Sequence, residues 1–374
     1  MLKSRRLWSW LGLGVIAAAL ALDVWHERGH IGIDFHTYLA AADVGLRQGW
    51  SHVYEQALVA AEQRRLVPTD PSQPFLSPPT VAWLVTPLTG LEFWTAFEIW
   101  AAFTFATFAA SLAWSGVSAG IFRWIAALAA LSPWWVLHAV NLGQVVPVVA
   151  AGVVVGWRLL RDRKDIAAGI ALSLIFLKPN TAILVPLALL AARRYRAFFS
   201  WVAVGAGLGA LALLLLGTHG ISDYINQLRA PLPPGADYLT LKGAAGATGM
   251  VATILRVLIA GAVLVAAYRL RGSSGLLIPV AIVGSLIVSP YLHASDLCLL
   301  SAAAWMVWEE RPSLAWRVPL AVGWLLASPF LYLTGFSPDL TRWPWIEMAL
   351  LVALVVMAWR PLTGSADLRT RAPA

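Results

Sequence analysis

The chain has 374 residues, of which 59% are hydrophobic and only 12% are charged. A soluble globular domain carries roughly 25% charged residues and could not keep this much apolar surface in water. A net charge of +8 would be compatible with nucleic-acid binding, but the basic residues stand in short gaps between apolar runs, which is the positive-inside pattern of membrane proteins. The single cysteine, Cys298, excludes an intramolecular disulfide.

The first apolar run, 7–24, follows Lys3, Arg5 and Arg6. A cleavable signal peptide has a similar pattern, but the rest of the chain is equally apolar, so we expect an uncleaved first span with a cytoplasmic N-terminus. Residues 23–78 then form the first extracytoplasmic loop. Two apolar faces in this loop predict interfacial helices lying on the membrane. The faces are Tyr38, Leu39, Ala42 and Leu46, and Val53, Ala57, Ala60 and Ala61.

Further apolar runs stand at 92–114, 122–138, 142–160, 197–217, 247–271, 276–291, 294–309, 316–335 and 342–360. The stretch 79–91 is short for a span. The run 166–192 is interrupted by Lys178-Pro179-Asn180, and each half, about 18 Å of helix, is shorter than a hydrocarbon core of about 30 Å. It predicts two short helices or a re-entrant hairpin.

The turn-rich segment 218–246 is expected to be a second outer loop. Counting from an internal N-terminus places the C-terminus inside as well, near Arg360, Arg369 and Arg371. The sequence therefore predicts an all-α polytopic membrane protein with about twelve transmembrane helices in a single domain, 1–374, of a bacterial plasma membrane.

Four polar interruptions fall on the expected outer side. They are the segments around Asp34, Asn141–Gln144, Lys178–Asn180 and Ser289–Asp296. Polar, irregular backbone at membrane depth is tolerated where it lines a cavity or is buried in protein. We therefore expect these four segments to form the walls of one extracytoplasmic cavity.

Lys178 is one of four lysines in the chain and is flanked by apolar residues on both sides. An ammonium group at that depth is costly unless it is paired or hydrated. It either reaches the outer interface or binds an anion, such as a phosphate, in the cavity. Arg256, inside the run 247–271, is a second candidate for the same task.

Asp34 follows Gly32 and precedes Phe35 and Tyr38, which suggests a shaped, partly desolvated site. Burial raises the pKa of a carboxylate and suits it to general-base chemistry. Asp296 is either a helix cap or part of the cavity. A histidine–aspartate metal site formed by Asp34, Asp296, His36 and His293 is a weaker alternative, because no pair of them shows a specific metal-ligand spacing. The sequence has no nucleotide-binding glycine motif, and no cofactor is expected.

Five motifs in order resemble glycosyltransferase family 87 of the GT-C superfamily. These are Gly32-x-Asp34-x-x-x-Tyr38, Phe75-x-Ser77-Pro78-Pro79, Gly143-Gln144, Lys178-Pro179 and Ser289-Pro290-Tyr291-x-His293-x-x-Asp296. Ser77 and Ser295 depart from the family pattern, in which tyrosine is common at both positions. The resemblance implies a GT-C-type helix bundle that transfers a sugar, such as mannose or another hexose, from a polyprenyl-phosphate donor with inversion. The acceptor is a glycolipid, glycan or protein hydroxyl.

In this interpretation Asp34 is the catalytic base, and three cationic or polar side chains bind the donor phosphate: Lys178, Arg256 and His293. The other expected substrate-binding residues are His36, Tyr38, Gln144, Asn180, Tyr291 and Asp296. A secondary transporter or lipid flippase is the main alternative, since an intramembrane lysine and aspartate also suit an ion-coupled site. A membrane acyltransferase with His36 or His293 as base is another. The one-sided distribution of polar breaks favours the transferase over a transporter.

Overall fold

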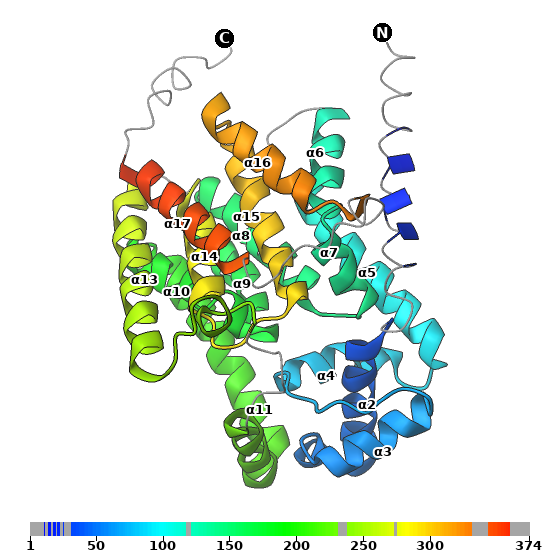
Figure 1. Cartoon of the computed structure of the whole chain (residues 1–374). Helices are drawn as coiled ribbons and strands as arrows, with labels where there is room; N and C mark the ends of the chain where they lie inside the picture. The colour runs from blue at the N-terminus through cyan, green and yellow to red at the C-terminus, as the bar shows by residue number, and fades with distance from the viewer. Residues whose placement is uncertain are drawn as a thin grey trace.

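The computed structural model describes residues 31–116, 121–230, 238–272, 275–330 and 343–359, with single positions between 11 and 25. Within these ranges the protein is helical and contains no β-strand, as the sequence predicts (Figure 1). The expected first span, 7–24, and the arginines from Arg360 onward lie outside the residues described continuously.

The first loop folds into a group of short helices at one end of the molecule (Figure 1). The group consists of α2 (Ile33–Gln48), η1 (Trp50–His52), α3 (Gln56–Leu66), α4 (Pro79–Val85) and η2 (Thr86–Leu88). Helix α2 is buried on all sides from Phe35 to Gly45, so it is a core helix and not one with a single apolar face. On α3 the expected face is also wrong, because Ala57 and Ala61 are exposed while Val59 and Gln63 are buried.

Two glutamines of α3, one on each of two turns, hold the extended segment that precedes α4. Gln63 donates from Nε2 to the carbonyl of Gln73 and accepts from its amide, at 2.7 and 2.9 Å. Gln56 makes the same pair of bonds to Phe75, at 3.3 and 3.0 Å. Side-chain amides thus replace a strand partner, and they fix the course of the proline-rich segment over α2.

The helices that follow pack into the main bundle. They are α5 (Phe93–Ser115), α6 (Ile121–Leu131), α7 (Trp134–Asn141), α8 (Val146–Arg161), α9 (Asp165–Leu172), η3 (Ser173–Leu177), η4 (Pro179–Thr181) and α10 (Leu184–Ala191). The expected run 122–138 is divided at Ser132-Pro133. The predicted break at Lys178–Asn180 is present as irregular backbone between α9 and α10, because proline and the 3₁₀ turns prevent a continuous helix.

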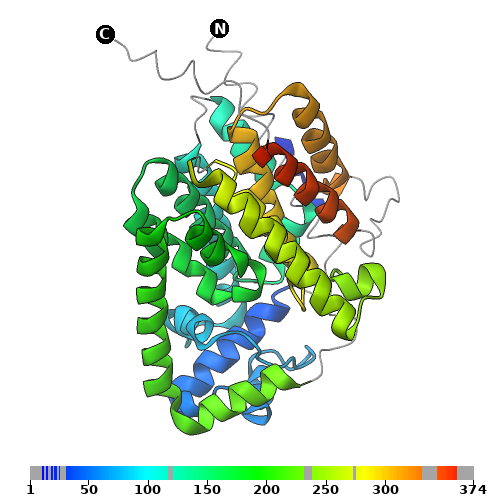
Figure 2. The same cartoon turned by 90° about the vertical axis from the view of Figure 1, so that its left-hand side faces the viewer.

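The remaining elements complete the bundle. They are α11 (Tyr195–Arg229), α12 (Leu241–Ala245), α13 (Gly249–Arg269), η5 (Leu270–Gly272), α14 (Leu277–Val288), η6 (Ala294–Leu297), α15 (Cys298–Glu309), α16 (Leu314–Leu326) and α17 (Trp343–Trp359). Helix α11 bends at Gly217 (φ 60°, ψ −170°) and continues beside the first-loop helices (Figure 2). Residues 218–229 are therefore helical, contrary to the loop expected there.

Three described helices are long and apolar enough to cross a membrane: Phe93–Ser115, Tyr195–Arg229 and Gly249–Gly272. Five shorter apolar helices accompany them, and a total of twelve spans is not reached among the described residues. Hardly any residue in the most apolar part of α11 is buried in the protein, whereas all of α14 is buried. An apolar surface of that length identifies an integral membrane protein.

Candidate active site

The N-terminus of α2 rests on the turn between α7 and α8. Gly32 donates its amide to the carbonyl of Asn141 at 2.7 Å, and Asp34 donates its amide to the carbonyl of Leu142 at 3.0 Å. Two of the sequence motifs, separated by more than a hundred residues, are thereby joined by backbone hydrogen bonds. Asp34 therefore lies beside the turn that carries Gln144.

Gly143 is required at this junction. Its φ of +73° is disfavoured for residues with a side chain, and a Cβ atom would lie 2.4 Å from Cβ of Phe35. Its carbonyl accepts a hydrogen bond of 2.8 Å from the indole of Trp100 on α5. The close approach of α2 and the orientation of the next residue, Gln144, both depend on this glycine.

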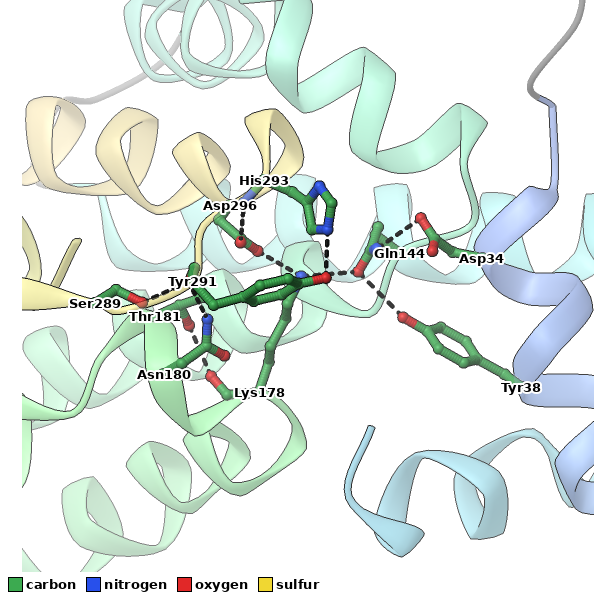
Figure 3. A network of polar contacts seen from close by, with 10 residues as sticks. All are labelled: Asp34, Tyr38, Gln144, Lys178, Asn180, Thr181, Ser289, Tyr291, His293 and Asp296. Carbon is green, nitrogen blue, oxygen red and sulfur yellow. Dashed lines mark hydrogen bonds and ion pairs between the residues drawn. The ribbon is translucent and has the colours of Figure 1, made fainter. Parts of the chain in front are cut away.

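Gln144 connects the two ionic groups of the site (Figure 3). Its Nε2 donates to Oδ2 of Asp34 at 2.6 Å, while its Oε1 accepts from Tyr38 Oη and Lys178 Nζ, each at 3.1 Å. A carboxylate only accepts hydrogen bonds and an ammonium only donates them. The Gln144 nitrogen must therefore face Asp34, and its oxygen must face Lys178. One side chain therefore separates the carboxylate of Asp34 from the ammonium of Lys178.

Lys178 also forms an ion pair with Asp296, with Nζ and Oδ1 2.5 Å apart. The carboxylate of Asp296 is fully buried, and its Oδ2 accepts from the amide of His293 at 2.8 Å. His293, not Asp296, is the N-cap of η6; Asp296 bonds back to the His293 amide from the first turn and pairs with Lys178 at the same time. A buried charge that is paired and hydrogen-bonded in this way holds its lysine in place.

The 289–296 segment forms the opposite wall (Figure 3). The carbonyl of Tyr291 accepts from Asn180 Nδ2 at 3.0 Å and from Ser289 Oγ at 2.5 Å, and these bonds tie the segment to the broken helix. The Tyr291 hydroxyl meets Nε2 of His293 in a short hydrogen bond. Thr181 donates to the carbonyl of Lys178 at 2.8 Å and stabilises the irregular turn.

The surroundings shift the proton affinities of the site. Burial raises the pKa of Asp34 above its ordinary value, although Lys178 and the Gln144 hydrogen bond act in the opposite direction. Protein atoms surround this carboxylate closely, yet part of its side chain remains accessible. Burial, with the charge of Lys178, lowers the pKa of His293. The pKa of Tyr38 is raised by burial and by Asp34, which keeps it a hydroxyl donor.

Eight predicted site residues meet in one network: Asp34, Tyr38, Gln144, Lys178, Asn180, Tyr291, His293 and Asp296. His36 lies apart, with Nε2 bonded to the carbonyl of Gln63 and its ring packed on Phe93. Arg256 stands on α13 outside the network, and its buried Nε has no hydrogen-bond partner among the described residues. Trp100 and Thr181 were not foreseen, since their positioning bonds leave no local pattern in the sequence.

The site differs from a metal centre in the way its donors are arranged. In the described part of the chain, the network's acids and histidine do not form a group of three close ligands, and Asp296 is already neutralised by Lys178. Paired carboxylate and ammonium groups around an accessible acid instead suit proton transfer beside an anionic leaving group.

The model of glycosyltransferase family 87 matches residues 75–329, well over half of the chain. This protein belongs to glycosyltransferase family 87. It is therefore a membrane-embedded sugar transferase, which needs a sugar donor and an acceptor. Neither curated proteins nor solved structures yield a match.

The matched range contains Gln144, Lys178 and the 289–296 segment, whereas Asp34 and Tyr38 precede it. The fold brings these two residues to the family region through α2, whose first turn is bonded to the α7–α8 turn. The first-loop helices and the family 87 region therefore build one polar site together.

Proposed function

We propose that this family 87 enzyme transfers a sugar from a polyprenyl-phosphate donor to an acceptor hydroxyl on the extracytoplasmic side, with inversion at the anomeric carbon. The observation that carries the proposal is the Gln144 amide, which has a partly accessible carboxylate on one side and a partly buried, ion-paired ammonium on the other. A base and a phosphate-binding cation are the two groups that such a displacement needs.

Asp34 acts as the base. Within the described part of the chain its carboxylate has Gln144 as hydrogen-bond partner through Oδ2, so Oδ1 is available to an acceptor hydroxyl. As the acceptor oxygen attacks the anomeric carbon, its proton passes to Asp34. The raised pKa of this carboxylate makes it a better proton acceptor than an exposed aspartate.

Lys178 stabilises the leaving group. The bond between the anomeric carbon and the phosphate oxygen breaks with its electron pair on the phosphate, whose negative charge needs a fixed cation. An ammonium has three N–H donors, and among the described residues Lys178 donates one to Gln144 while it forms an ion pair with Asp296. A further N–H is left for a phosphate oxygen. His293 lies close to this cation and supports the same task as a neutral donor, while Arg256 stays a prediction.

A lipid-linked donor fits the apolar surroundings of the site. A cavity of about 330 Å³ lies between α15, α16 and α17, and its lining includes Leu300, Trp316 and Trp343. None of the network residues lines this cavity, but Leu300 follows Asp296 by four residues and connects the two along the chain. In this proposal the prenyl chain of the donor binds in the apolar cavity, and its phosphate binds Lys178.

The charge distribution supports an extracytoplasmic site. Gln144 lies just before the start of α8, and Arg158 and Arg161 lie at its end. The 16 residues of α8 therefore separate Gln144 from this basic turn by about 24 Å. Arg161 pairs with Glu310, and Arg194 pairs with Asp165. The basic turns at 158–164 and 193–196 therefore lie at the same end of the bundle, away from the network. By the positive-inside rule these turns are cytoplasmic.

The test is transfer by the purified protein in nanodiscs, offered a panel of polyprenyl-phosphate sugars and lipid acceptors. Mass spectrometry would identify a new glycoside, and NMR of the product would give its anomeric configuration. We expect Asp34→Asn to abolish transfer and to keep donor binding, and Lys178→Met to weaken both.

Asp70→Asn is the matched control, since it removes another carboxylate of the same loop outside the network. Full activity of Asp34→Asn, or equal loss in Asp70→Asn, would refute the role of Asp34. Retention of configuration would exclude the single displacement, and transfer from nucleotide sugars alone would exclude the lipid donor.

A further inference from the structure

A second group of reactive side chains lies outside the transferase site, where the first loop meets the bent end of α11. His52 ends η1, Glu55 precedes α3, and His219 follows the bend at Gly217. One possible ligand atom from each of these three residues lies within 4.8 Å of the other two. Glu55 Oε1 contacts Nδ1 of His52 and lies 3.8 Å from Nε2 of His219.

Surrounding oxygens orient His219 for coordination. Its Nδ1 lies 3.3 Å from the carbonyl of Ser51 and 3.6 Å from Oδ2 of Asp223. Both neighbours are acceptors, so the ring proton belongs on Nδ1 and the lone pair of Nε2 points toward Glu55. A carboxylate or carbonyl behind a histidine is the usual outer partner of a metal-bound imidazole.

The backbone holds the two elements together independently of these side chains. Gly220 is buried against η1, and a Cβ atom there would lie 2.8 Å from the carbonyl oxygen of Ser51. The rings of Tyr54 and Tyr224 stack with centroids 4.6 Å apart. Packing therefore sets the backbone positions of the three ligands before any ion binds, which lowers the cost of forming the site.

We propose that His52, Glu55 and His219 bind a divalent transition-metal ion, with Zn²⁺ as the best fit. Two imidazole nitrogens and one carboxylate oxygen are typical zinc donors, and water completes the tetrahedron. Imidazole ligands disfavour Mg²⁺ and Ca²⁺, which prefer oxygen. The ion cross-links the helix after Gly217 to the first loop, and Asp223 holds His219 in the required orientation. This site is independent of the sugar transfer proposed above.

The binding test uses the full chain without a histidine tag, in nanodiscs and freed of metal. Co²⁺ serves as the probe, because its visible absorption becomes intense in a tetrahedral site, and Zn²⁺ as the competitor. We expect one equivalent of Co²⁺, displaced by Zn²⁺. His52→Ala and His219→Ala should lose saturable binding, and Asp223→Asn should weaken it by about 10- to 100-fold. His36→Gln is the matched control, because His36 bonds to the carbonyl of Gln63 outside this group, and it should bind as the wild type does.

Absence of saturable Co²⁺ binding, or equal binding by the wild type and by both histidine variants, would overturn the site. Glu55→Gln, which keeps the size of the side chain, provides a second variant should an alanine variant fail to fold. Hydrogen exchange of residues 218–229 tests the cross-link separately. Zn²⁺ should slow exchange there in the wild type and leave His219→Ala unchanged; equal exchange with and without Zn²⁺ in the wild type would exclude the cross-link.

Discussion

Replacing Gln144 with leucine removes the amide that links the base to the cation. Three hydrogen bonds are lost, to Asp34, Tyr38 and Lys178, and two of them involve a charged group. A hydrogen bond to a charged group contributes about 1.5–3 kcal/mol. If one such bond is needed in the transition state, kcat/KM falls by about 10- to 150-fold. The ion pair of Lys178 with Asp296 remains, so the protein should still fold.

The pH profile of kcat/KM distinguishes loss of positioning from general damage. Burial raises the pKa of Asp34 and the Gln144 hydrogen bond lowers it, so Gln144→Leu raises this pKa further. A base works when deprotonated, and activity is lost as the pH falls through its pKa. The acid limb should therefore move to higher pH. Gln144→Glu keeps the size but adds a like charge beside Asp34, and should move the limb in the same direction.

Gln48→Leu is the matched control, because Gln48 is exposed at the end of α2. Its activity and its acid limb should equal those of the wild type. The reasoning fails if Gln144→Leu changes kcat/KM by less than about threefold, or if its acid limb stays at the wild-type pH. A fall in kcat/KM with an unmoved limb would mean that Asp34 is not the group that titrates.

Three further substitutions test the site and its supports. Lys178→Met should lower kcat by about 100- to 1000-fold, as for a lost oxyanion donor, and should raise the acid limb because Lys178 lowers the pKa of Asp34. Gly143→Ala should destabilise the protein by about 1–3 kcal/mol or more, seen as a lower Tm, because of its positive φ and the contact with Phe35. Gln63→Leu should cost about 1–3 kcal/mol and increase proteolysis of residues 67–78, since two backbone groups lose their partner; unchanged Tm values would contradict either assignment.

The sequence alone determined the class of fold and the family. Apolar runs with few charges permit only membrane-embedded helices, because backbone groups must be satisfied within each helix in lipid. The sequence predicted a broken helix at Lys178-Pro179, and the break is present. It left the surroundings of the ammonium open, and the structure pairs it with Asp296. The order and residue types of the five motifs predicted membership of glycosyltransferase family 87, and the match over residues 75–329 confirms it.

The tertiary structure decided which polar residues meet. His36 and Tyr38 are two residues apart on α2, yet only Tyr38 reaches Gln144, because His36 faces α3 and bonds to Gln63. The sequence did not predict the helix at 218–229, because Gly217 adopts a positive φ and bends α11 just before it. His219 meets the first loop only because of that bend. Composition and periodicity are local, whereas these contacts join residues far apart in the chain, so packing alone selects them.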